Sequence, residues 1–181
     1  LQKKIDADFY AIYDLPNKTR TFFQNQKLVS FKKIWHYHDQ INFKKNEIDT
    51  EYLSNFEKKY DIDLLELGSN DRILNHYNEY YNFSKNQILS ILEQECRLFE
   101  KILDEVKPHF FITSETALQP HHLFYKLCQK QGIKILMLNH ANWNTLCYIS
   151  EERHKLDNLH SLSIDNSKKY TFYELQKILD G

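Results

Sequence analysis

Polar side chains that can bind or react follow two apolar segments of the chain. The stretch 109–116, HFFITSET, begins apolar and ends in four polar residues, Thr113, Ser114, Glu115 and Thr116. The apolar run 133–138, IKILML, is followed by Asn139, His140, Asn142, Trp143 and Asn144. Amides, an imidazole and an indole in one place suit the hydroxyl groups and ring faces of a sugar or nucleotide.

Both polar runs also have a purely structural explanation. A Thr-Ser-Glu-Thr run before a helix is a common N-cap, and Glu115 is favourable near the positive end of a helix dipole. The run 139–144 is equally compatible with an ordinary surface loop. The sequence leaves both alternatives open.

A further set of candidate residues lies nearer the N-terminus. Asp14 ends a segment rich in β-formers, and His36 and His38 share one face of the segment 33–38, with Asp39 directly behind. Two histidines on one strand face suit a metal ion or a proton-transfer pair. No second cluster at metal-ligand spacing accompanies them, so we assign no metal site.

The segments around these residues predict alternating helices and strands. An S-x-x-Q capping box at Ser84 begins a helix whose apolar residues recur every three or four positions up to Pro108. A buried strand at 109–113, a helix at 118–131 and a buried strand at 133–138 follow. This order is typical of a parallel βαβ unit, and the apolar character of both strands favours helices on both faces of the sheet.

The remaining segments extend this pattern. We expect strands at 8–15 and 33–38, a helix at 49–60, and a last helix at 171–180 that has its own capping box. We therefore predict one domain over residues 1–181, an α/β fold with an open, mainly parallel sheet of Rossmann-like type. Ligands of such sheets bind at the carboxyl ends of the strands, where the polar runs lie.

Composition narrows the choice of partners. The 24 Lys and Arg residues nearly balance 25 Asp and Glu residues, for a net charge of −1, so no global field favours nucleic acid. The three cysteines are widely spaced, without a C-x-x-C pair, which indicates reduced thiols and a cytoplasmic location. The longest apolar run is too short to cross a bilayer. The chain begins at Leu1, so we leave open that it is the N-terminal part of a longer protein.

Several common nucleotide and nucleophile motifs are absent from the sequence. It contains no G-x-G-x-x-G, no P-loop and no G-x-S-x-G elbow, and it has only three glycines. We therefore expect no bound cofactor. The adjacent residues His121 and His122 project in different directions from a helix, so they do not form a joint ligand pair.

Two long segments carry a family resemblance. SKNQILSILEQECRLFEKILDEVKPHFFI (84–112) and LFYKLCQKQGIKILML (123–138) resemble the N-terminal part of surface-carbohydrate or capsular polysaccharide biosynthesis proteins. Asp71-Arg72, ahead of Tyr80, Tyr81 and Phe83, resembles a D-R or E-R element of that group. The similarity extends over most of residues 8–150.

The resemblance implies the N-terminal, Rossmann-like half of a GT-B-type glycosyltransferase. In such enzymes this half faces the acceptor, a second half binds most of the nucleotide-sugar, and no metal is normally required. The chain departs from the pattern at Asn139-His140-Ala141, where a glycine commonly follows the strand, and it contains no second Rossmann-like half. A second GT-B-like domain or a partner protein would have to complete the site.

Glycosyl transfer needs a base for the acceptor hydroxyl and cations or amides for the leaving phosphate. Under this resemblance we expect Glu115 or His140 to act as the base and Arg72 as a charge partner. The substrate, a carbohydrate or nucleotide-sugar, would be bound by the other polar residues near the strand ends, Asp14, Thr113, Ser114, Thr116, Asn139, Asn142 and Trp143.

Two other functions stay open at this point. One is a noncatalytic carbohydrate- or nucleotide-binding module that acts through a partner. The other is a small metal-dependent hydrolase built around four residues, Asp14, His36, His38 and Asp39.

Overall fold

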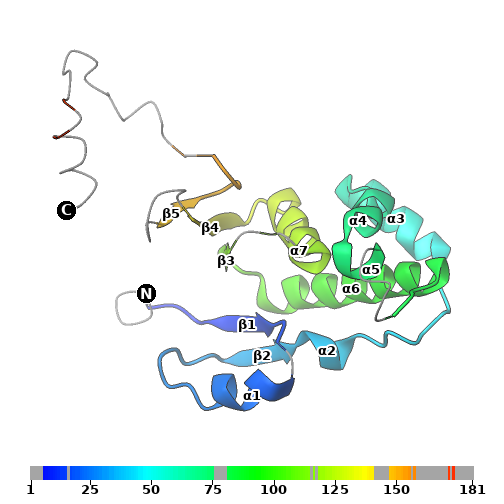
Figure 1. The fold of residues 1–181 in the computed structure, drawn as a ribbon, viewed down its shortest axis with the longest axis horizontal. Coiled ribbons are helices and arrows are strands. Elements are labelled where there is room, and N and C mark those ends of the chain that lie inside the picture. The colour runs from blue at the N-terminus through cyan, green and yellow to red at the C-terminus, as the bar shows by residue number, and fades with distance from the viewer. Residues whose placement is uncertain are drawn as a thin grey trace.

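The computed structural model describes residues 6–15, 17–75, 81–114, 116, 118–140, 147–155, 157, 171 and 173. The described residues form both helices and strands (Figure 1). The elements are β1 (Tyr10–Tyr13), α1 (Asn17–Gln24), β2 (Lys33–His36), α2 (Tyr37–Gln40), α3 (Thr50–Tyr60), α4 (Leu64–Asn70), α5 (Arg72–Asn75), α6 (Lys85–Val106), β3 (Phe110–Ser114), α7 (Gln119–Lys130), β4 (Lys134–His140) and β5 (Cys147–Ser150). The predicted α/β class is confirmed.

The described strands form two small sheets. β1 pairs in parallel with β2, and β3 pairs in parallel with β4. β5 lies antiparallel on the other edge of β4. In the β3–β4 pair Phe111 is opposite Ile135 and Ile112 is opposite Leu136, so the predicted parallel pairing of these two strands is confirmed. The sequence also predicts one open, mainly parallel sheet, whereas the described residues form two small ones that include an antiparallel pair.

The two sheets share no backbone hydrogen-bond ladder among the described residues, and side-chain contacts link them instead. The ring of Phe9, just before β1, lies 6.5 Å from that of Phe110 at the start of β3. Beyond the other end of β1, Asp14 contacts His121 in the helix that follows β3. β1 and β3 therefore run in the same direction, and their carboxyl ends face a common region. The four-residue length of β1 and β2 limits each to a short ladder.

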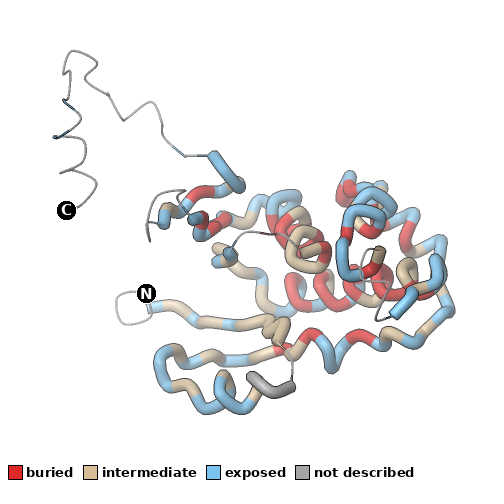
Figure 2. The backbone as a smooth tube through the Cα atoms, in the orientation of Figure 1, coloured by how far each residue is buried: buried red, intermediate tan, exposed pale blue. Residues whose placement is uncertain are grey.

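The long helix α6 begins and ends as its sequence predicts. The Ser84 hydroxyl accepts from the Gln87 backbone N–H at 3.2 Å, and the Gln87 side chain accepts from the Ser84 N–H at 2.9 Å. The helix ends at Val106, where Lys107 adopts a left-handed conformation with φ of 46°. A nearly continuous row of buried residues follows one side of this helix (Figure 2).

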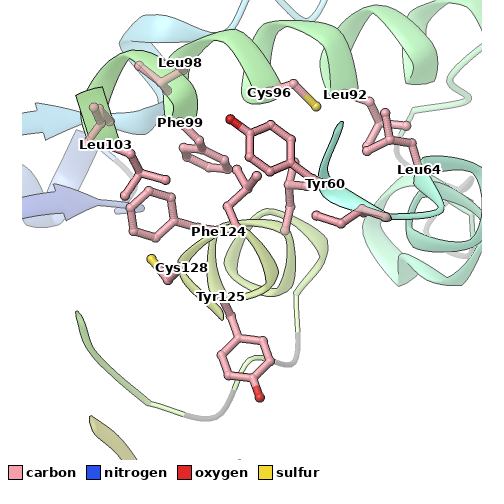
Figure 3. Packing of buried hydrophobic residues seen from close by; sticks show 14 of the residues in the cluster. Tyr60, Leu64, Leu92, Cys96, Leu98, Phe99, Leu103, Phe124, Tyr125 and Cys128 are labelled. Carbon is pink, nitrogen blue, oxygen red and sulfur yellow. The ribbon is translucent and has the colours of Figure 1, made fainter. Parts of the chain in front are cut away.

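The core lies between α6, α7 and the β3–β4 pair. Phe124 of α7 makes edge contacts with Phe99 of α6 and Phe111 of β3, each at 5.0 Å between ring centroids. Leu103 and Cys128 pack at the same junction (Figure 3). Burial of these rings and aliphatic chains fixes α7 against α6, and this contact sets the position of the first turn of α7.

Three boundaries differ from the sequence-based expectation. The strand predicted at 33–38 ends at His36, because Tyr37 and His38 belong to the helix α2, so His36 and His38 do not share a strand face. β4 continues through Asn139 and His140 because it pairs there with β5, so these two residues belong to a strand. Residues 64–70 form the helix α4, since Asp63 caps it by accepting from the Glu66 N–H at 2.8 Å. Of the helix predicted at 171–180, only residues 171 and 173 are described. Within the described residues, no helix is both long and apolar enough to span a bilayer.

Candidate functional site

Asp14 holds two histidine side chains at the carboxyl ends of β1 and β2. His38 Nε2 lies 2.9 Å from Asp14 Oδ1, and His121 Nε2 lies 3.1 Å from Asp14 Oδ2. The hydrogen bond from His121 lowers the pKa of the Asp14 carboxyl, partial burial opposes this shift, and the charges of both histidines lower the pKa further. The Asp14 side chain is 21% exposed, whereas both imidazoles are more accessible. We call these three residues the Asp14 cluster.

The geometry of the Asp14 cluster suits proton transfer. Each imidazole uses Nε2 for its contact with the carboxylate, which favours the tautomer with the proton on Nε2 and a lone pair on Nδ1. A neutral imidazole in this state can take a proton at Nδ1, and the carboxylate stabilises the imidazolium that results. His38 and His121 therefore each form a histidine–carboxylate pair with a solvent-accessible imidazole.

A buried carboxyl lies behind the cluster. Glu95, in the middle of α6, is 0% exposed and accepts hydrogen bonds from the hydroxyl of Tyr37 and from the amide of Gln119, the latter at 2.7 Å. Burial raises the pKa of Glu95 to about 7, while the two hydrogen bonds oppose the shift. The Gln119 backbone N–H donates to Asp71 at 3.0 Å. Glu95 thus joins the start of α2 to the start of α7.

A cleft of about 860 Å³ lies between α4 and α7. Its polar lining includes Asp71, Gln119, Thr116, His122 and Lys126. The Thr116 hydroxyl lies 3.3 Å from His122 Nδ1, and the pKa of His122 is lowered by burial and, secondarily, by the charge of Lys126. A smaller cleft of about 260 Å³ adjoins it and shares Thr116, His122 and Lys126.

Several acidic residues of the cleft stabilise the fold. Asp63 caps α4, Asp61 pairs with Lys130 at 2.7 Å, and one oxygen of Glu57 accepts from the Leu64 N–H at 3.0 Å. Within the described residues, no group of three or more His, Cys, Asp or Glu side chains is arranged to hold a metal ion.

The first turn of α7 separates the Asp14 cluster from the cleft. His121 contacts Asp14, whereas His122 lines the cleft. Adjacent residues of a helix project about 100° apart, which explains this division. Gln119 belongs to both sides, since it lines the cleft and donates to Glu95. The Asp14 cluster therefore lies on one side of the first turn of α7, and the cleft lies on the other.

Comparisons of the chain with protein-family models, curated proteins and solved structures found no match. The assignment of the site therefore depends on its geometry and on the sequence pattern.

The structure brings some of the expected site residues into this region. Asp14 is the centre of the cluster, and Thr116 lines both clefts. Three others lie outside the described residues: Glu115, Asn142 and Trp143.

Other expected site residues lie elsewhere. Thr113 and Ser114 end β3 beside Met137 and Leu138 of β4, and the Thr113 hydroxyl donates to the Ser114 carbonyl at 3.1 Å. Arg72 is exposed at the start of α5 and lines neither cleft.

Asn139 and His140 face opposite sides of β4, as neighbours in a strand must. Asn139 is 0% exposed, and its amide donates to Ser150 Oγ at 2.8 Å and to the Met137 carbonyl at 3.1 Å. This side chain ties β4 to β5. His140 is exposed, with Nδ1 3.7 Å from the sulfur of Cys147 across the antiparallel pair. Neither residue lines the clefts or contacts Asp14 among the described residues.

The four residues of the hydrolase hypothesis are divided between separate contacts. His38 contacts Asp14, Asp39 forms an ion pair with Arg20 at 2.8 Å, and the ring of His36 packs edge-on against Tyr13. The described contacts thus leave Asp39 and His36 outside the Asp14 cluster.

Sequence reasoning missed Glu95, Tyr37, Gln119 and the role of His121. Glu95 carries a readable signal, because it lies three residues after Leu92 and four before Phe99, on the apolar stripe of α6. A carboxyl on an apolar stripe indicates a buried polar contact. No comparable local signal marks the other residues, whose partners are distant in sequence.

Proposed function

We propose that this chain is the acceptor-side, Rossmann-like domain of a cytoplasmic, glycosyltransferase-like protein of surface or capsular polysaccharide biosynthesis. A second GT-B-like domain or a partner protein brings the nucleotide-sugar. The observation that carries the proposal is the Asp14 carboxylate, which holds two accessible imidazoles at the strand ends. The resemblance of residues 84–112 and 123–138 to that group supports the same assignment.

In the proposed reaction an imidazole of the Asp14 cluster is the general base. Its Nδ1 takes the proton of the acceptor hydroxyl as the oxygen forms a bond to the anomeric carbon of the donor sugar. The bond from that carbon to the phosphate oxygen breaks, and the nucleotide leaves with the bonding electrons. Asp14 stabilises the imidazolium. Other hydroxyl groups of the acceptor reach past the first turn of α7 into the cleft, where Thr116 and His122 can exchange hydrogen bonds with them.

Substitution of the cluster tests the proposal. Asp14→Asn, His38→Gln and His121→Gln keep side-chain size and remove a charge or the titrating ring. We expect Asp14→Asn and one of the two histidine variants to lower kcat for sugar transfer roughly a hundredfold or more, with a smaller change in KM. His109→Gln, at an exposed histidine before β3, is the matched control.

The readout is transfer by the full-length protein from a panel of nucleotide-sugars, together with surface polysaccharide produced by cells that carry each variant. Wild-type transfer by Asp14→Asn and by both histidine variants would refute the assignment of the base.

A noncatalytic binding module is the second candidate function. The cleft favours it, because carboxylates, amides and a hydroxyl line a space large enough for a sugar. In that case the chain binds an oligosaccharide or nucleotide-sugar without transferring the sugar, and Thr116→Ala and His122→Gln weaken this binding. Titration calorimetry with the same panel, read beside the transfer assay, distinguishes the two functions, because binding without transfer supports the module.

A further inference from the structure

We propose that Glu95 is a positioning residue for the Asp14 cluster and the cleft. It acts through Tyr37 and Gln119, and its protonation state decides the direction of the hydrogen bonds that these two side chains make. The inference rests on the proposed function only in that the Asp14 cluster is taken as the reacting group.

Both hydrogen-bond partners of Glu95 lie close in sequence to a histidine of the Asp14 cluster. Tyr37 directly precedes His38, and Gln119 lies two residues before His121 in the first turn of α7. Both side chains donate to the same buried carboxyl. Each imidazole of the cluster is therefore within two residues of a group anchored on Glu95. Figure 1 shows α6 running between the β1–β2 pair with α2 on one side and α7 with α4 on the other.

Gln119 carries the same connection to the cleft. Its backbone N–H donates to Asp71 Oδ2, while Asp71 Oδ1 accepts from the N–H groups of Ile73 and Leu74. Asp71 and Gln119 both line the cleft. The buried carboxyl, the wall of the cleft and the start of α5 thus form one chain of hydrogen bonds.

Burial and the nearby carboxylates disfavour the charged form of Glu95, whereas the hydrogen bonds from Tyr37 and Gln119 favour it. Tyr37 and Gln119 contact it directly, and the carboxylates of Asp71 and Asp14 act on it from the α4–α5 junction and from the end of β1. The neighbouring Cys96 thiol has its pKa raised by burial and by the charge of Glu95. Burial raises the pKa of Glu95 to about 7, so the carboxyl changes its state within the physiological range.

Protonation changes what the carboxyl can do. The carboxylate is an acceptor only, so Tyr37 and Gln119 must both donate to it. The neutral acid carries a proton that needs an acceptor of its own. Either the Tyr37 hydroxyl reverses its role or the Gln119 amide turns over, and we expect this change to alter the surroundings of His38 or His121.

Imidazole NMR tests this coupling without substrate. In protein with ¹⁵N-labelled histidine, we expect the chemical shifts of His38 and His121 to include a component that follows the titration of the ¹³C-labelled Glu95 carboxyl, separate from protonation of the rings themselves. Glu95→Gln, which cannot ionise, should remove that component. Glu93→Gln is the matched control, because Glu93 is also buried on α6 but contacts Arg97 and the Asp49 N–H.

Tyr37→Phe removes one arm of the connection and remains informative if Glu95→Gln does not fold. It should alter the His38 signal more than the His121 signal. In transfer assays, Glu95→Gln should lower kcat about tenfold with little change in KM, and should flatten the pH profile near 7.

The two proposals fail separately. Unchanged His38 and His121 titrations in both Glu95→Gln and Tyr37→Phe would overturn the positioning role, whatever the activity. If Glu95→Gln shifts these titrations while Asp14→Asn and both histidine variants keep wild-type transfer, the positioning role stands and the proposed base is wrong.

Discussion

His121 contacts Asp14 across 107 residues of sequence, with Nε2 3.1 Å from Oδ2. This contact brings the end of β1 to the first turn of α7 and so joins the two sheets at their carboxyl ends. His38 approaches the other oxygen of the same carboxylate at 2.9 Å. The Asp14 side chain therefore holds the end of β1, the helix α2 and the first turn of α7 close to one another.

The lowered pKa of Asp14 predicts a stability contribution that is lost in acid. A carboxyl whose folded pKa lies below its ordinary value of 3.8 stabilises the fold above that value, and the contribution disappears as the pH falls through the folded pKa. We expect Asp14→Asn to be less stable than wild type by about 1 kcal/mol near neutral pH. Urea unfolding from pH 7 to pH 2.5 should show the two proteins converging in acid; a constant difference would contradict the prediction.

Glu95 predicts the opposite pH dependence. Its pKa is raised from 4.5 to about 7 by burial, so the folded protein binds more protons than the unfolded chain between these values. Its stabilising effect is complete below pH 4.5 and is lost as the pH rises to about 7, a total of about 3 kcal/mol.

Urea unfolding at intervals from pH 4.5 to pH 8 measures this effect. The difference in unfolding free energy between wild type and Glu95→Gln should change by that amount over the range. Glu93→Gln, at a second buried carboxyl of α6, is the control. Parallel curves for Glu95→Gln would show that the carboxyl is ionised throughout.

The three cysteines should differ in reactivity. Cys96 and Cys128 are 0% exposed, and burial raises the pKa of Cys128 to about 12 and that of Cys96 as well. Cys147 is exposed on β5. We expect a disulfide reagent to modify one thiol per native chain rapidly and three after denaturation, with Cys147→Ser removing the rapid phase. Rapid modification of Cys96 or Cys128 would contradict the packing of α6 on α7.

Gly68 should be sensitive to a single added methyl group. A Cβ at this position of α4 would lie 3.0 Å from Leu92 Cδ1 and 3.4 Å from Ile88 Cγ2 on α6. Leu92 is 1% exposed and has little room to move. Although alanine favours helix, we expect Gly68→Ala to destabilise the protein by about 1 kcal/mol in urea unfolding. Ser69→Ala, at an exposed neighbour, is the control. A more stable Gly68→Ala protein would show that the helices can separate there.

Much of the fold could be predicted because its signals are local. The capping box at Ser84 and the apolar stripe that follows it define α6, and the apolar runs near Phe111 and Leu136 define the parallel pair. The extension of β4 through His140 was missed, because polar residues there resemble a loop until β5 is known to pair with them.

The candidate site could be predicted only in part. Strand-end position identified Asp14, and the polar run at 113–116 included Thr116. The connection through Glu95 depends on pairings separated by 58 residues from Tyr37 and 24 from Gln119, which no local periodicity encodes. Tertiary packing of α6 between α2 and α7 created the buried carboxyl contact.

The absence of a described hydrogen-bond ladder between β1 and β3 has a dynamic consequence. Side-chain contacts between the sheets can break without rupturing a backbone ladder, so the β1–β2 pair can open as a separate cooperative unit. Its amides should exchange with solvent sooner than those of Leu92 to Leu103 in α6. Movement of the β1–β2 pair away from β3 would therefore change the surroundings of Asp14 while the helical core stays intact.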